Sequence, residues 1–89
     1  MVTGPRDFLA PDPATEAKAR EVASRLVEPA IADAKRAGRP QVHCYISGGP
    51  YRERLTPAVF DAVMRHYVQA GWKVERDSDR EGDSIILTP

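Results

Sequence analysis

The segment Ser47-Gly48-Gly49 is the first place where residue types and spacing could do chemistry. Consecutive glycines let backbone amides turn toward an anion, and the segment stands between an expected strand and an expected helix, as phosphate-binding loops do. Such a loop feeds directly into its helix and usually supplies a lysine. Here seven residues separate Gly49 from Pro57, and none of them is lysine. We therefore interpret the segment as a flexible turn, with an anion site as the alternative that the sequence leaves open.

A second pattern, at Asp77, Asp79, Glu81 and Gly82, matches the start of a calcium-binding loop. Oxygen ligands stand at alternate positions and glycine stands at the sixth. The twelfth position is Thr88, however, where such a loop needs a bidentate glutamate, and no helices are expected on either side. We predict a charged, solvated turn and no metal site.

Neither histidine belongs to a recognisable catalytic pair. His43 and Cys44 are neighbours in an expected strand, so their side chains leave opposite faces and cannot act together as base and nucleophile. His66 stands beside Arg65 on an expected helix. The sequence shows no paired carboxylates in an apolar setting and no nucleophile elbow. We therefore predict that the protein is not an enzyme and uses no cofactor, with Cys44 as a small core residue.

Composition and charge restrict the remaining function classes. The chain has 89 residues, of which 13 are basic and 13 acidic, so no net charge attracts it to nucleic acid or to an anionic membrane. Its one cysteine excludes an internal disulfide and fits a reducing compartment. The first residues lack the order of a signal peptide, and no apolar run approaches membrane-spanning length. These features predict a cytoplasmic protein with one modest core.

Two helices are expected from their capping residues and from apolar residues at helical spacing. Asp12-Pro13 starts the first helix, and Gly38 ends it. Thr56-Pro57 starts the second helix, which Gly71 ends, and an apolar stripe runs along it from Val59 to Val68.

Pro29 interrupts the pattern of the first helix, because it removes a backbone hydrogen bond and crowds the carbonyl of Arg25. Either one helix kinks there or a second helix begins. The register of the apolar face continues past the proline, which favours a kink.

Three strands complete the predicted fold. The first covers residues 41–47, the second opens at Trp72, and the third covers residues 85–88, with residues 77–83 as the tip between the last two. The order is therefore helix, strand, helix, strand, strand. We predict an α+β fold in which two helices pack on one face of a three-stranded sheet. The first two strands could be parallel neighbours, or the third could lie between them, so the strand order stays open.

Residues 1–12 are expected to form an irregular N-terminal arm ahead of a single domain at residues 13–89. Phe8 and Leu9 are the sizeable apolar residues of this arm. They would pin it to the domain or to a second subunit, or would stand exposed in a mobile tail.

Residues 29–88 carry a pattern of elements that can be compared with known proteins. It consists of Pro29-Ala30-Ile31 through Ala37-Gly38-Arg39, an apolar strand, a helix closed by Gly71-Trp72, and a hairpin ending in Ile85-Ile86-Leu87. This pattern resembles that of many small phage-encoded α/β proteins. The resemblance implies a viral source, and because those proteins share no single activity it implies no site residues.

A helix followed by a hairpin is also the last part of a winged-helix domain, a fold that binds nucleic acid. Nucleic-acid binding is therefore the alternative function. Arg65 and His66, on the outer face of the second helix, would then meet phosphate. However, the sequence before this helix does not predict the short preceding helix and tight turn of such domains. The hairpin tip is also acidic, and phosphate would repel it. Nucleic acid is therefore the less favoured partner.

A protein-interaction module is the class that remains, and we take it as the predicted function. The sheet face opposite the helices is expected to show His43, Tyr45, Lys73, Glu75 and Ile86. Tyr51, Arg52 and Arg54 form a second candidate patch, since tyrosine and arginine are favoured at binding hot spots.

The alternative for both patches is an ordinary solvated surface. We predict an adaptor or inhibitor-like protein whose protein partner the sequence does not identify. An exposed sheet edge or the N-terminal arm would also favour a homodimer.

Overall fold

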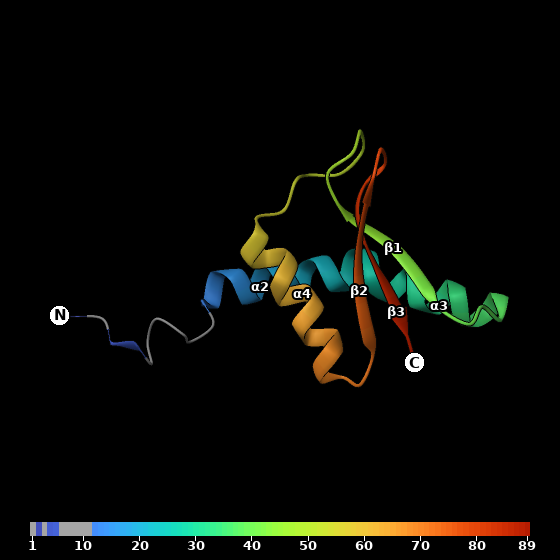
Figure 1. Cartoon of the computed structure of the whole chain (residues 1–89), viewed down its shortest axis with the longest axis horizontal. Coiled ribbons are helices and arrows are strands. Elements are labelled where there is room, and N and C mark those ends of the chain that lie inside the picture. Colours follow the sequence, from blue (N-terminus) through green and yellow to red (C-terminus); the bar gives the residue numbers. More distant parts are fainter. Residues whose placement is uncertain (1, 3, 6–11) are drawn as a thin grey trace.

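The computed structural model of the chain describes residues 2, 4, 5 and 12–89. Its elements follow in the order α2 (Pro13–Val22), η1 (Ala23–Val27), α3 (Glu28–Ala37), β1 (Val42–Ser47), α4 (Pro57–Gln69), β2 (Lys73–Asp79) and β3 (Gly82–Thr88) (Figure 1). The predicted α+β class is confirmed, with helices followed by β1, α4 and a hairpin. Most of the predicted arm, including Phe8 and Leu9, lies outside the described residues.

The capping residues start the helices where the sequence predicts. The carboxylate of Asp12 accepts a hydrogen bond from the amide of Thr15 at 3.0 Å, which satisfies a free donor in the first turn of α2. The hydroxyl of Thr56 does the same for the amide of Val59 at 3.2 Å in α4. At the end of α3, Gly38 takes the left-handed conformation with φ of 67°.

Helical backbone continues through Pro29, and the irregularity lies just ahead of it. Between α2 and α3 the chain widens into the π-helical stretch η1, where the amide of Glu28 donates to the carbonyl of Ala23, five residues back. A wider turn relieves the conflict between Pro29 and the carbonyl of Arg25 that a regular α-helix would create. In Figure 1, α2 and α3 are successive parts of one long rod. The predicted interruption therefore takes the form of a π-helical stretch in one helical rod.

The sheet has β3 at its centre, between β1 and β2, and both pairs are antiparallel. This arrangement settles the strand order that the sequence left open. The first two strands are not neighbours, because the last strand of the chain lies between them. Both β1 and β2 are consequently edge strands.

The hairpin of β2 and β3 is longer than the sequence predicted. The two strands stay paired as far as Asp79 and Gly82, so Arg80 and Glu81 alone form the turn. The expected tip at residues 77–83 was therefore too long. The carboxylate of Asp79 accepts a hydrogen bond from the amide of Glu81 at 2.8 Å, and Gly82 has φ of 124°. These two features allow the strands to continue into a tight turn. The polarity of the residues alone predicted a longer tip.

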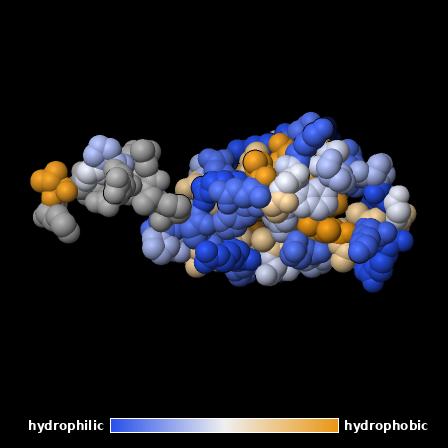
Figure 2. All heavy atoms as spheres, turned by 90° about the horizontal axis from the view of Figure 1, so that it is seen from below, coloured by the Kyte–Doolittle hydropathy of each residue, from blue (hydrophilic) through white to orange (hydrophobic). Residues whose placement is uncertain are grey.

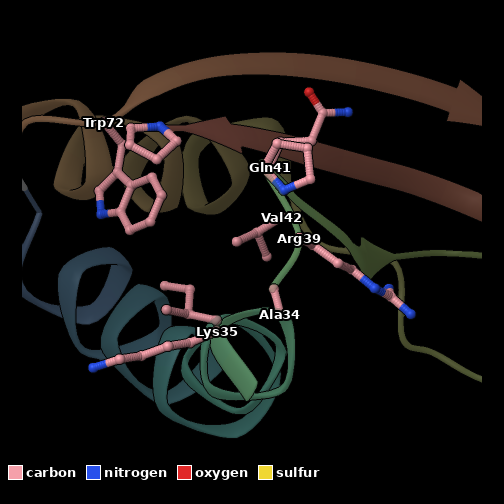
Figure 3. Close-up of a pocket in the computed structure, with 9 residues that line it drawn as sticks. Ala34, Lys35, Arg39, Gln41, Val42 and Trp72 are labelled. Atoms are coloured by element: carbon pink, nitrogen blue, oxygen red, sulfur yellow. The ribbon is translucent and has the colours of Figure 1, made fainter. Parts of the chain in front are cut away.

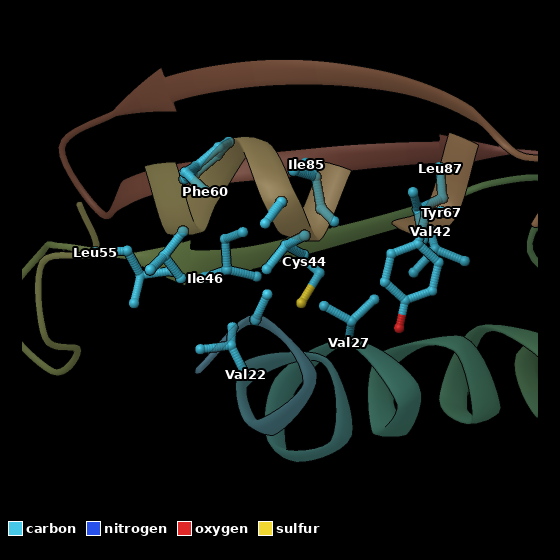
Figure 4. Close-up of a cluster of buried hydrophobic side chains, with 14 of the residues drawn as sticks. Val22, Val27, Val42, Cys44, Ile46, Leu55, Phe60, Tyr67, Ile85 and Leu87 are labelled. Carbon is cyan, nitrogen blue, oxygen red and sulfur yellow. The ribbon is translucent and has the colours of Figure 1, made fainter. Parts of the chain in front are cut away.

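The core lies between the helices and the inner face of the sheet (Figure 4). Inward-pointing residues of β1 and β3 meet buried residues of the helices, and together they include Val22, Val27, Val42, Cys44, Ile46, Phe60, Val63, Tyr67, Ile85 and Leu87. Most of the apolar stripe predicted on α4 is therefore confirmed. Val68 is the exception, since it is 56% exposed. It follows Tyr67 and points about 100° further around the helix, away from the sheet.

Cys44 is a core residue, as predicted. Its side chain is buried, and its thiol donates to the carbonyl of Leu26 at 3.3 Å. Burial raises the pKa of this thiol to about 11, against a minor opposing effect of Arg52. The protonated thiol is therefore its stable form at neutral pH.

Arg76 closes the core on the side of β2. Its guanidinium lies 4.2 Å from the ring centroid of Phe60, and it reaches Asp83 on the neighbouring strand at 3.8 Å.

In the face shown in Figure 2, hydrophilic side chains cover most of the domain and leave only small, separate apolar patches. None of the helices formed by the described residues combines the length and hydrophobicity that crossing a bilayer requires.

The loop after β1 presses directly against the hairpin turn, and two glycines make this approach possible. A Cβ atom at Gly49 would stand 2.0 Å from the carbonyl oxygen of Glu81. A Cβ atom at Gly82 would stand 2.4 Å from the carbonyl oxygen of Ser47. Close backbone packing thus accounts for Gly49 without an anion.

Replacement of Gly49 by alanine is expected to destabilise the protein strongly. The new methyl group would collide with backbone, and φ of 74° is unfavourable for alanine, so we expect a loss of about 2–4 kcal/mol in the free energy of unfolding. Gly38→Ala is the control, because its φ is 67° but no atom lies within 4 Å; this variant should lose only about 1 kcal/mol. Urea denaturation followed by circular dichroism measures both. Equal losses would contradict the close contact.

Candidate interaction surface

The outer face of the sheet carries the residues that the sequence placed there. His43 and Ile86 are cross-strand neighbours, and Glu75 flanks Ile86 from the other side. Tyr45 pairs with Ser84 in the same manner, and Lys73 is the first residue of β2. The side chains on this face point away from the helices, because those that alternate with them form the core.

His43 and Tyr45 form an ordered pair on this face. Their ring centroids are 4.9 Å apart, and the His43 Nε2 atom lies 2.9 Å from the hydroxyl of the buried Ser84. The Tyr45 hydroxyl donates a hydrogen bond of 2.6 Å to Asp79. This bond raises the pKa of Tyr45 and lowers the pKa of Asp79, so a neutral phenol faces an ionised carboxylate.

Arg52 joins the two patches that the sequence presented as separate. Its guanidinium lies 5.1 Å from the centroid of the Tyr45 ring, within the range of a cation–π contact. It also donates to the carbonyl of Glu81 at 3.2 Å. Arg52 thus covers Tyr45 and ties the loop after β1 to the hairpin turn.

The loop is also tied to the first helix, through Glu53. The carboxylate of Glu53 lies 2.6 Å from the ammonium of Lys18 and 3.5 Å from the guanidinium of Arg25. The hydrogen bond from Lys18 lowers the pKa of Glu53, and the same bond raises the pKa of Lys18. The carbonyl of Glu53 accepts a bond from the amide of Gly48 at 2.9 Å. Each exposed ion pair is weak, but together with this backbone bond they define the loop conformation.

Tyr51 projects from this anchored loop. Its side chain is 85% exposed, although the loop is fixed further along by a 2.8 Å hydrogen bond from the amide of Leu55 to the buried hydroxyl of Ser47. The guanidinium of Arg54 lies beside Gly48, 3.6 Å from where a Cβ atom would stand. We call the resulting area the Tyr45–Arg52 surface, which comprises His43, Tyr45, Tyr51, Arg52 and Arg54.

The anion site considered at Gly48-Gly49 has little room in this geometry. The amide of Gly48 already donates to Glu53, and Gly49 lies against the carbonyl oxygen of Glu81, which would repel an anion.

In the acidic turn that resembles a calcium loop, the carboxylate of Asp79 already accepts hydrogen bonds from Tyr45 and from a backbone amide. Within residues 12–89 and the three described residues before them, no group of three or more metal-ligating side chains is placed to hold an ion.

Arg65 and His66, the residues of the alternative nucleic-acid interface, both contact Glu16 of α2. The His66 Nε2 atom lies 2.5 Å from the carboxylate, and the Arg65 guanidinium forms an ion pair with it. The Glu16 side chain is only 14% exposed. These contacts link α4 to α2, so phosphate would have to compete with Glu16 for both side chains. The sequence offered no signal for them, because Glu16 stands 49 and 50 residues earlier.

Comparison with known proteins finds no protein-family model, curated protein or solved structure that matches the chain. The predicted resemblance to phage-encoded proteins therefore stays a prediction, and the function must be inferred from the surface itself.

Two influences on His66 oppose each other. Contact with Glu16 favours the charged imidazolium, whereas burial and the guanidiniums of Arg65 and Arg20 favour the neutral ring. Burial has the greatest weight. The pKa of His66 is therefore lowered, and the neutral ring can still donate its Nε2 hydrogen to Glu16.

The lowered pKa of His66 predicts a pH dependence of stability. The unfolded chain protonates His66 more readily than the folded chain, so the free energy of unfolding is highest above about pH 6.5 and falls as the pH drops below it. His66→Gln retains a donor but cannot titrate, and its stability should decline less steeply between about pH 6.5 and 5. Urea denaturation of both proteins across this range measures the difference. If the unmodified protein instead gains stability over the variant on acidification, the Glu16 contact dominates.

Proposed function

We propose that the protein is a small, non-enzymatic interaction module of the adaptor or inhibitor type, which binds a protein partner through the Tyr45–Arg52 surface. The observation that carries this proposal is Tyr51. A large aromatic side chain that is 85% exposed has no role in the core, yet it stands on a loop fixed to a helix, a strand and the hairpin turn.

The anchoring of this loop supports a binding role on energetic grounds. Binding loses affinity when loops and side chains must be ordered as the complex forms. Here Arg52 is already held over Tyr45, and Tyr45 is held by Asp79. Tyrosine and arginine are also enriched among the residues that dominate interface energies. The surface therefore combines favoured residue types with a low ordering cost.

Charge indicates what kind of partner surface would fit. Arg52 and Arg54 stand in the loop, while Asp77 and Glu81 stand in the adjoining end of the hairpin. A complementary partner would place acidic groups opposite the loop and basic groups opposite the hairpin end. The nucleic-acid alternative has less support, because these carboxylates would repel a polyanion.

A phage source and a cytoplasmic location remain predictions that accompany the proposal.

Tyr51 is the position at which a partner should be captured. With the photo-crosslinking residue p-benzoylphenylalanine in place of Tyr51, we expect a discrete adduct in a lysate of the cells in which the protein is naturally made. The same residue in place of Val68 is the matched control, because Val68 is exposed but lies on α4. An adduct of twice the chain mass would identify a second copy as the partner. Equal adducts from both positions, or none, would contradict the proposal.

Affinity for the captured partner provides the quantitative test. Tyr51→Ala should weaken binding at least about tenfold, as expected for a hot-spot aromatic residue, while Val68→Ala should leave it within about twofold. Both variants should keep the melting temperature, since neither side chain is part of the core. Surface plasmon resonance and thermal denaturation measure the two quantities. An unchanged affinity of Tyr51→Ala would place the interface elsewhere.

A further inference from the structure

A pocket of about 290 Å³ lies at the end of the sheet opposite the hairpin turn. It is bounded by α3, by the start of β1 and by the residues that flank β2 and β3. Val42 and Ala34 are buried and form its floor, and the half-buried Ile31 and Trp72 form its sides. The close-up in Figure 3 shows the indole of Trp72 on one side, facing α3 across the pocket.

The size and lining of this pocket suit a small apolar group. Its volume is close to the lower limit for small-molecule sites, which is roughly 300 Å³. The pocket has a rigid base, because Val42 belongs to a paired strand and Ala34 to a helix. An aromatic ring or a short aliphatic chain would therefore cover the exposed apolar atoms and would contact the Trp72 indole.

The charged side chains that line the pocket all have one sign. Lys35 and Arg39 line it, and no acidic residue does. Some basic side chains of the domain form ion pairs with carboxylates, as Arg36 does with Asp33. Among the residues that the structure describes, neither Lys35 nor Arg39 has an ion-pair partner. In Figure 3 the Lys35 side chain runs toward the Trp72 end of the pocket and the Arg39 side chain runs the other way.

We propose that this pocket binds a small carboxylic acid with an aromatic or aliphatic body. The body would occupy the space between Trp72 and Val42, and the carboxylate would meet the Lys35 ammonium at the mouth. The stem of Lys35 already lines the pocket while its charged end reaches water, so a ligand anion at the rim keeps both charges partly hydrated. Arg39 adds positive potential from the opposite side. The site is separate from the Tyr45–Arg52 surface and does not depend on the proposed function.

Trp72 provides the measurement, because it is the only tryptophan in the chain. Phenylacetate and hexanoate, titrated into the full chain at constant ionic strength, should change its fluorescence saturably with a Kd of about 0.1–1 mM. Phenylacetamide and phenethylamine have a similar body without the negative charge, and they should bind more weakly. Comparison of phenylacetate with these two compounds isolates the contribution of the carboxylate.

Two variants assign that contribution to Lys35. Lys35→Ala should weaken phenylacetate binding about two- to fivefold, as expected for a partly exposed ion pair. Arg80→Ala is the charge-matched control at the distant hairpin turn and should bind phenylacetate unchanged. Both residues are exposed, so both variants should fold, and circular dichroism verifies this.

Four results would overturn the proposal. The first is the absence of a saturable response to either acid, and the second is equal affinity for phenylacetate and phenylacetamide. The third is an unchanged affinity in Lys35→Ala. The fourth is Trp72 fluorescence that depends on protein concentration without any ligand, which would show that a second copy of the chain covers the pocket.

Discussion

The central position of β3 is the constraint on which the rest of this structure depends. Ile85 and Leu87 are completely buried, and β3 pairs with β1 on one side and β2 on the other. The strand that completes the sheet is therefore the last one in the chain. Until β3 is in place, β1 and β2 have no strand between them, and the helices lack most of the sheet surface on which they pack. We infer that the three strands and the helices form one cooperative unit.

The same arrangement creates the candidate interaction surface. Because β3 is antiparallel to both neighbours, the end of β1 and the hairpin turn lie at the same end of the sheet. The loop after β1 must then pass over the turn, and glycine at positions 49 and 82 allows the two backbones to touch. Arg52 is brought over Tyr45 by this contact. The surface is thus a consequence of strand order as much as of residue type.

Local sequence signals predicted where helices and strands form, but not which of their side chains meet. Asp12, Thr56 and Gly38 predicted the helix ends correctly, because a cap is determined by residues three or four positions away. Tyr45 meets Asp79 from 34 residues away, and His66 meets Glu16 from 50. Such pairs follow from strand order and helix packing, so no local pattern of charge or hydrophobicity reveals them. His43 and Tyr45 were correctly predicted on the outer face of the sheet, but the contact of Arg52 with Tyr45 was not predicted.

The two ends of the sheet carry chemically different features, and β1 separates them. Val42 lies in the floor of the pocket, while Ser47 anchors the loop that presents Tyr51. The six residues of β1 hold these points roughly 17 Å apart, five steps of about 3.3 Å each. Side chains at that separation share no partner, so substitutions at the two ends should have additive effects on stability and on binding. Coupling between them would require a shift of β1 itself. The burial of Cys44 and Ile46 opposes such a shift, because both would have to leave the core together.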